Sequence, residues 1–123
     1  MRITIKDKNN FMNLFNSIYQ NDKIDNINGI SIDSRNIMNN DIFFPIKGKT
    51  YDGHDYIKDI VENKTIKYFS EHDDNYAIKC KSVKDEIIKL SMHWREKTKA
   101  KIIAITGSNG KTTIKDMLFH IIN

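Results

Sequence analysis

Two glycines and a lysine near residue 110 form a pattern that is typical of phosphate-binding loops. The segment runs Thr106-Gly107-Ser108-Asn109-Gly110-Lys111-Thr112-Thr113, between an apolar run and the expected start of a helix. Glycine allows backbone angles and close approach that a Cβ forbids, and successive N–H groups at a helix N-terminus attract an anion. Lys111 can neutralise terminal phosphates, and the Thr112 hydroxyl can ligate Mg²⁺. The segment therefore predicts a nucleotide-phosphate site.

The loop departs from the general pattern G-x-x-x-x-G-K-[ST] at one position. Residue 105 is isoleucine, so the motif present is the shorter G-x-x-G-K-T. An ordinary glycine turn that caps a helix beside an exposed lysine is the alternative interpretation. The apolar run before the loop and the helical pattern after it favour the phosphate loop, because that is the context this chemistry requires.

Other polar clusters are weaker candidates. Asp52-Gly53-His54-Asp55 could hold a metal or transfer protons, but its residue types also suit a tight turn that caps a helix, which we favour. The remaining histidines have no ligand spacing with one another or with Cys80, so we expect no metal site built from side-chain nitrogen or sulfur. Cys80 ends an apolar segment and is expected to pack as a small buried side chain.

Apolar periodicity predicts the elements that position these residues. Period-two or continuous apolar patterns predict strands at 3–5, 29–33, 41–46, 65–70, 76–80 and 102–105. Spacings of three and four predict helices over 11–19, 56–61, 83–94 and 114–122, with Asn9 or Asn10 as the first N-cap and Ser82 as the third. Pro45 indicates that its strand lies at an edge or stops there. The alternation of strands and helices predicts an α/β fold, with 102–105 buried in a parallel sheet.

Composition excludes several classes of protein. The 123 residues contain 20 Lys and Arg against 16 Asp and Glu, for a formal charge of +4. The basic residues are scattered and mostly lysine, without the arginine clusters of nucleic-acid readers, so we expect no nucleic-acid partner. No apolar run reaches the length of a membrane span or signal peptide, which predicts a cytoplasmic protein. The single cysteine excludes an internal disulfide.

The phosphate loop resembles the ATP loop of the Mur ligases, the amide-forming synthetases of peptidoglycan precursors, in which the short form is usual. Upstream, Asp33-Ser34-Arg35, the segment 41–48 and the segment 51–57 resemble the N-terminal domain of the later ligases of this family. The resemblance covers about residues 29 to 123 and implies a small mixed-sheet domain at 1–98 that binds the substrate's UDP-sugar. Residues 99–123 would be the first β-P-loop-α unit of a truncated parallel-sheet ATPase domain.

The resemblance also assigns roles to residues. ATP contacts fall on Gly107, Ser108, Asn109, Gly110, Lys111, Thr112 and Thr113, with Lys111 and Thr112 catalytic and Thr112 a ligand of Mg²⁺. The UDP-sugar is expected at Ile32, Asp33, Ser34 and Arg35, and more weakly at Lys49, Thr50 and Tyr51. Arg35 could instead be a structural partner of Asp33 or Asp52.

Ser108 and the continuation Lys115-Asp116-Met117 most resemble the family member that adds D-alanyl-D-alanine to a UDP-N-acetylmuramoyl-tripeptide through an acyl phosphate. The ligase that adds the third peptide residue and a non-catalytic nucleotide-binding module remain alternatives. The family's other catalytic groups lie downstream of the loop, so we expect a truncated, monomeric chain that is inactive alone.

Overall fold

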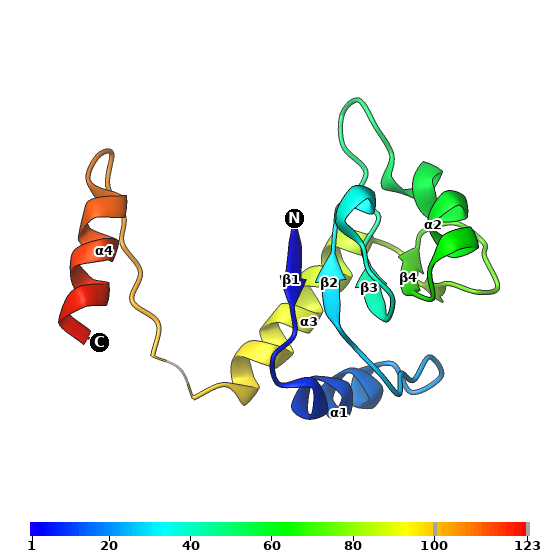
Figure 1. Cartoon of the computed structure of the whole chain (residues 1–123), viewed down its shortest axis with the longest axis horizontal. Coiled ribbons are helices and arrows are strands. Elements are labelled where there is room, and N and C mark those ends of the chain that lie inside the picture. The colour runs from blue at the N-terminus through cyan, green and yellow to red at the C-terminus, as the bar shows by residue number, and fades with distance from the viewer. Residues whose placement is uncertain (100, 123) are drawn as a thin grey trace.

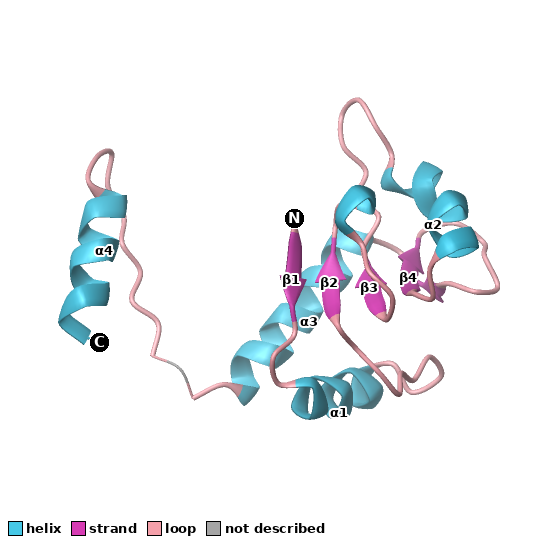
Figure 2. Cartoon of the chain, in the orientation of Figure 1, coloured by secondary structure: helices cyan, strands magenta, loops and turns pink. Residues whose placement is uncertain are grey.

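The computed structural model describes residues 1–99 and 101–122 and builds a five-stranded sheet. The strands lie side by side in the order in which they follow along the chain (Figure 1, Figure 2). They are β1 (Arg2–Thr4), β2 (Gly29–Ser31), β3 (Asp41–Phe43), β4 (Lys67–Ser70) and β5 (Ile78–Lys79). β1 is antiparallel to β2, and the other three pairings are parallel. The sheet is thus mixed, as the predicted α/β class requires.

Helices cover both faces of this sheet. They are α1 (Lys8–Ile18) and α3 (Val83–Lys97) on one face and α2 (Ile57–Asn63) on the other, with short 3₁₀ turns η1 (Ser34–Asn36) and η2 (Gly53–Tyr56). A further helix, α4 (Lys111–Ile122), does not pack on the sheet. Because side chains alternate across a strand, Ile42 and Phe69 join the core beneath α1 and α3, whereas Phe43 and Tyr68 pack with α2. The predicted strands at 29–33, 41–46, 65–70 and 76–80 are therefore confirmed in shorter form.

Aromatic contacts hold α1 and α3 on the first face. The Phe15 and Tyr19 ring centroids lie 4.5 Å apart, and the Phe11 ring lies 5.5 Å from the Trp94 ring. The Tyr19 hydroxyl donates to Glu86 Oε2 at 2.7 Å, and burial together with this bond raises the pKa of Tyr19. Trp94 is half-buried against this core, in agreement with its predicted place on the apolar stripe.

The helix starts were predicted with mixed success. The Ser82 side chain accepts from the Asp85 amide at 3.2 Å, which confirms it as the N-cap of α3. The prediction of Asn9 or Asn10 for α1 is wrong, because Asp7 lies at the cap and its carboxylate accepts from the Asn10 amide at 3.3 Å. A carboxylate at this position also complements the positive end of the helix dipole.

Pro45 follows the end of β3 and does not mark an edge. β3 pairs with β2 on one side and β4 on the other, so it lies inside the sheet. The strand stops at Phe43, two residues before the proline, which removes the need for a backbone donor there. The prediction that the strand stops near Pro45 is confirmed, and the alternative that it lies at an edge of the sheet is wrong.

The strand predicted at 102–105 is absent from the described part of the chain. Ile102 and Ile103 are more than half exposed and belong to no strand. Figure 1 shows this segment and α4 apart from the sheet, which accounts for the difference: a buried parallel strand requires neighbouring strands, and none lies beside it among residues 1–99 and 101–122. The helix predicted over 114–122 is confirmed within α4.

Candidate functional site

Four of the residues predicted to face a UDP-sugar line one pocket of about 480 Å³, called here the β2 pocket. They follow β2 directly and form its turn into η1. The buried Ser31 hydroxyl shapes this turn, since it accepts from the Asp33 amide at 3.0 Å and donates to the Asp33 carbonyl at 2.9 Å. These four are Ile32, Asp33, Ser34 and Arg35, and Tyr51, which was predicted more weakly, lines the same pocket. Its volume lies within the range of small-molecule sites.

Asp33 and Arg35 form a two-pronged ion pair at the pocket wall. Arg35 Nε and Nη2 donate to the two Asp33 carboxylate oxygens, each at 2.9 Å. These bonds hold the pKa of Asp33 well below its usual range and raise the pKa of Arg35. Of the partners predicted for Arg35, the structure selects Asp33. The Arg35 side chain is nevertheless 84% exposed, so its guanidinium remains accessible to a ligand anion.

The loop after β3 supplies the pocket's opposite rim. Tyr51 and Gly53 line the pocket, whereas Lys49 and Thr50 do not. Both of these residues are exposed, so the structure does not bring them together with Ser34. A Cβ on Gly53 would lie 2.8 Å from the Pro45 backbone, which means that this close turn requires glycine.

The sequence interpretation missed three other lining residues, which are Met1, Phe43 and Tyr56. Met1 reaches the pocket because β1 runs antiparallel to β2, and its amino group lies 3.6 Å from Asp33 Oδ2. No local pattern contains that pairing. Tyr56 was predicted on a short helix, and nothing in the sequence pattern assigned it to a pocket. In the structure Tyr56 is 45% exposed.

The predicted phosphate loop leads into α4. Gly107 and Gly110 have φ angles of 150° and 77°, values that L side chains rarely adopt, and nothing lies within 4 Å of a Cβ placed on Gly110. The Lys111 ammonium donates to the carbonyls of Gly107 and Ser108. The loop thus has the glycine conformations and helix N-terminus that a phosphate requires, and Lys111 must leave these carbonyls to meet one.

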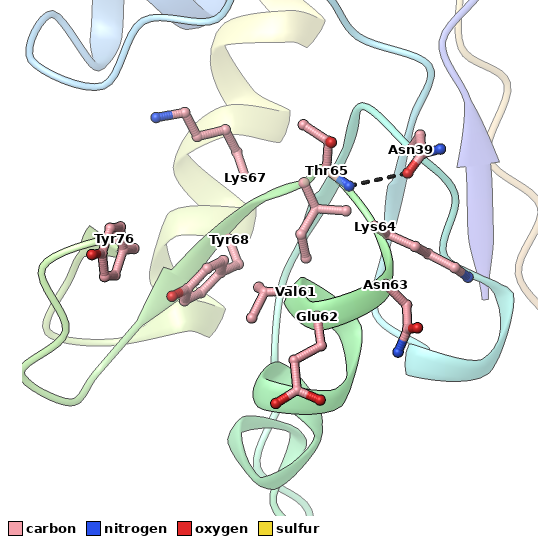
Figure 3. Close-up of a pocket in the computed structure, with 10 residues that line it drawn as sticks. Asn39, Val61, Glu62, Asn63, Lys64, Thr65, Lys67, Tyr68 and Tyr76 are labelled. Carbon is pink, nitrogen blue, oxygen red and sulfur yellow. Dashed lines mark hydrogen bonds between the residues drawn. The ribbon is translucent and has the colours of Figure 1, made fainter.

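A larger groove of about 760 Å³ lies between α2 and β4, and Figure 3 shows the residues that line it. None of the predicted site residues is among them. Two of its polar groups already have protein partners: the Tyr68 hydroxyl donates to Asp74, and the Thr65 amide donates to Asn39 Oδ1 at 3.0 Å. Burial and the Asp74 bond raise the pKa of Tyr68. Because no predicted site residue lines this groove, we place the candidate nucleotide-sugar site at the β2 pocket.

The turn interpretation of Asp52-Gly53-His54-Asp55 is confirmed. Asp52 caps η2, and its carboxylate accepts from the His54 amide at 3.0 Å. This bond, together with His54 Nδ1 at 2.6 Å, lowers the pKa of Asp52. The prediction about ligand spacing concerned the histidines other than His54, and it did not consider that His72 lies beside His54, with the two ring centroids 4.7 Å apart.

Cys80 is half-buried beside the first core, and burial raises the pKa of its thiol. These surroundings agree with the predicted packing role. Across the part of the chain that the structure describes, no helix has both the length and the apolar character to cross a membrane.

A scan against protein-family models matches residues 26–109 to "Mur ligase family, catalytic domain". A solved structure of UDP-N-acetylmuramoylalanyl-D-glutamyl-2,6-diaminopimelate–D-alanyl-D-alanyl ligase from Acinetobacter baumannii superposes with a TM-score of 0.73 at 27% identity. The superposition covers 90% of this chain and 27% of that chain.

Curated relatives carry two names. A UDP-N-acetylmuramoyl-L-alanyl-D-glutamate–2,6-diaminopimelate ligase from Clostridium tetani is 35% identical over 88% of this chain and 24% of its own length. The corresponding ligase of Rickettsia felis is 31% identical over 72% of this chain and 18% of its own length. A UDP-N-acetylmuramoyl-tripeptide–D-alanyl-D-alanine ligase from Rickettsia prowazekii is 34% identical over 76% of this chain and 22% of its own length.

The chain thus spans about a fifth to a quarter of the relatives that it matches. The family model covers more than half of the chain, and the relatives agree with it. On these grounds the chain belongs to the Mur ligase family.

Proposed function

We propose that this chain is the part of an ATP-dependent Mur ligase that binds the UDP end of a UDP-N-acetylmuramoyl-peptide and supplies the phosphate loop. The intact enzyme would add D-alanyl-D-alanine to the tripeptide form during peptidoglycan precursor synthesis in the cytoplasm. The observation that carries the proposal is the β2 pocket, where Ile32–Arg35 meet Tyr51 in a cavity of about 480 Å³.

The pocket's chemistry suits a nucleotide-sugar. Arg35 presents an exposed guanidinium that is already oriented by Asp33, and a planar guanidinium can bind two phosphate oxygens at once. Tyr51 and Tyr56 add aromatic surface on which a base or sugar can pack. Ser34 adds a hydroxyl to the lining of the pocket.

The phosphate loop supports the ATP-dependent step. ATP, when bound, supplies the phosphoryl group that activates the peptide carboxylate as an acyl phosphate for attack by the incoming amine. The part of this chain is to hold that nucleotide: the amides of residues 107–113 face its phosphates, Lys111 neutralises charge, and the Thr112 hydroxyl would hold Mg²⁺. Gly107 and Gly110 fit this role, since both have positive φ angles, the conformation from which phosphate loops build an anion-binding turn.

Titration of the chain with UDP-N-acetylmuramoyl-tripeptide tests the proposed pocket. Ser34→Tyr fills the pocket and should weaken binding at least tenfold, whereas Ser91→Tyr, on the exposed surface of α3, should bind as the wild type does. Equal binding by all three proteins would contradict this site. With the tripeptide substrate, ATP and D-alanyl-D-alanine present, we expect no phosphate release from the chain alone. Turnover would contradict the proposal that this chain supplies only substrate binding and the phosphate loop.

The ligase that adds the third peptide residue is the second candidate, and the names of the Clostridium and Rickettsia felis relatives favour it. Our preference depends on Ser108 and the segment Lys115-Asp116-Met117. Binding of the dipeptide and tripeptide substrates should be compared directly. Tighter binding of the tripeptide form would support the D-alanyl-D-alanine step, and tighter binding of the dipeptide form would support the alternative.

A further inference from the structure

Three side chains that can ligate a metal meet beside the sheet, although they come from two separate segments. Asp52 and His54 lie at the start of η2, and His72 lies in the turn between β4 and β5. One ligand atom from each residue lies within 4.8 Å of the other two. None of these residues was given a role in the proposed binding of nucleotide-sugar or ATP.

His54 is held in a fixed orientation by two contacts. Its side chain is only 6% exposed, and its Nδ1 lies 2.6 Å from Asp52 Oδ1. Its Nε2 lies 3.3 Å from the Glu71 amide. Because a backbone N–H can only donate, Nε2 carries the lone pair and Nδ1 carries the proton that Asp52 accepts. Nδ1 is the ring nitrogen that faces Asp52, so an ion shared with this carboxylate must bind His54 at Nδ1 and take the place of that proton.

The other two groups are available to a ligand. His72 is exposed, its ring meets the His54 ring edge-on, and its ring nitrogens make no hydrogen bond within residues 1–99 and 101–122. The second oxygen of Asp52 has the ammonium of Lys47 at 3.7 Å, a distance that is long for a hydrogen bond. Neither His72 nor this oxygen therefore has to give up a strong contact in order to bind an ion.

We propose that Asp52, His54 and His72 bind one zinc-class divalent ion, with water as the fourth ligand. Two imidazoles and one carboxylate form a donor set that suits Zn²⁺, whereas Mg²⁺ prefers oxygen alone. In a tetrahedral zinc site the ligand atoms lie about 3.3 Å apart, given bonds of about 2.0 Å. Loading therefore draws the exposed His72 inward and replaces the hydrogen bond between His54 Nδ1 and Asp52. The His54 proton moves to Nε2, which costs the long contact from the Glu71 amide.

The site would connect two loops that the sheet alone does not join. Asp52 lies near the end of the loop 47–53, which contributes Tyr51 and Gly53 to the β2 pocket, and His54 follows it directly. Its third ligand lies in the turn 71–77. An ion would tie this turn to the rim of the pocket and restrict the loop. The proposal depends only on the cluster itself, and it can fail while the proposed function stands.

Calorimetric titration of the untagged chain with ZnCl₂ tests the site. We expect one ion per chain, an affinity at least tenfold weaker in His72→Ala, and an unchanged affinity in His93→Ala. His93 is the matched control because it is also exposed, and its ring bonds only to the Lys89 carbonyl within its own helix. His72 is chosen over His54 because the buried His54 ring also supports the local turn.

Cobalt substitution gives a second readout that a purely structural role would not change. Wild type and His93→Ala loaded with Co²⁺ should show the visible absorption of a four-coordinate site, and His72→Ala should lose it. Absence of stoichiometric Zn²⁺ binding in the wild type would overturn the proposal. Equal affinities in the two variants would also overturn it, because binding would then be adventitious.

Discussion

The buried carboxylate of Asp41 should be the most costly polar group to remove from this fold. Its side chain is 0% exposed and accepts three hydrogen bonds. Arg2 Nε and Nη2 donate at 2.7 and 2.8 Å, and the Met38 amide donates at 2.8 Å. The same bonds raise the pKa of Arg2. They fasten the edge strand β1 across β2 to β3, and so hold Met1 at the β2 pocket.

Asp41→Ala should lower the free energy of unfolding by about 3 to 5 kcal/mol, the usual cost of breaking a buried ion pair from one side. We expect a value near the lower limit, because Arg2 lies on an edge strand with its side chain 15% exposed and can turn partly toward water. Asp41→Asn should cost less, about 2 kcal/mol, since its carbonyl can still accept from the Met38 amide.

Urea unfolding measures these differences in the free energy of unfolding. The m-value, the slope of that free energy against urea concentration, is held constant between variants. The double variant Arg2→Met with Asp41→Leu should recover much of the loss, because it leaves neither charge unpaired. Asp73→Ala is the control: its ion pair with Lys79 is exposed on both sides, and its removal should leave the midpoint unchanged. A loss below about 1 kcal/mol in Asp41→Ala would refute the reasoning, as would a double variant less stable than either single one.

Three further predictions concern the caps and the pocket. Ser82→Ala should lower the free energy of unfolding by about 1 kcal/mol through loss of the α3 cap, as measured in urea. Gly53→Ala should weaken nucleotide-sugar binding and lower the melting temperature, because the added Cβ would meet the Pro45 backbone at 2.8 Å; unchanged binding would contradict the assigned rim. Arg35→Ala should return the pKa of Asp33 toward 3.8, which carboxyl NMR can follow. Since the pKa is lowered in the folded state, this pair stabilises the wild type above about pH 4 and its contribution fades as the pH falls further; a pKa that stays low in the variant would show that Arg35 is not its cause.

Local patterns predicted most of the elements in residues 1–99. Alternation in 29–33 identified β2, and the apolar run in 41–46 identified β3, which is buried on both faces. The spacing of Val83, Leu90 and Trp94 identified α3, because one face of this helix packs on the core. The first N-cap was misplaced, since Asp7 and the two asparagines are all competent capping residues. Only the backbone geometry chooses among them.

Long-range pairing explains what local patterns could not predict. The antiparallel placement of β1 brings Met1 to the β2 pocket, and the turns before η2 and after β4 bring His54 beside His72. The strand predicted at 102–105 is not formed because it lacks such a long-range partner within the described residues. Its residues have strong strand propensity, but a strand in a buried sheet is defined by its neighbours.

The order of the strands has a consequence for synthesis on the ribosome. Each strand pairs with the one made immediately before it, from β1 through β5, so the sheet can grow by one edge at a time. Among the described strands, each one pairs with its neighbour in sequence, so the contacts are comparatively local, which favours rapid folding. Nascent chains of this protein should therefore acquire protease resistance in steps, with the β2 pocket complete before α3 has left the exit tunnel.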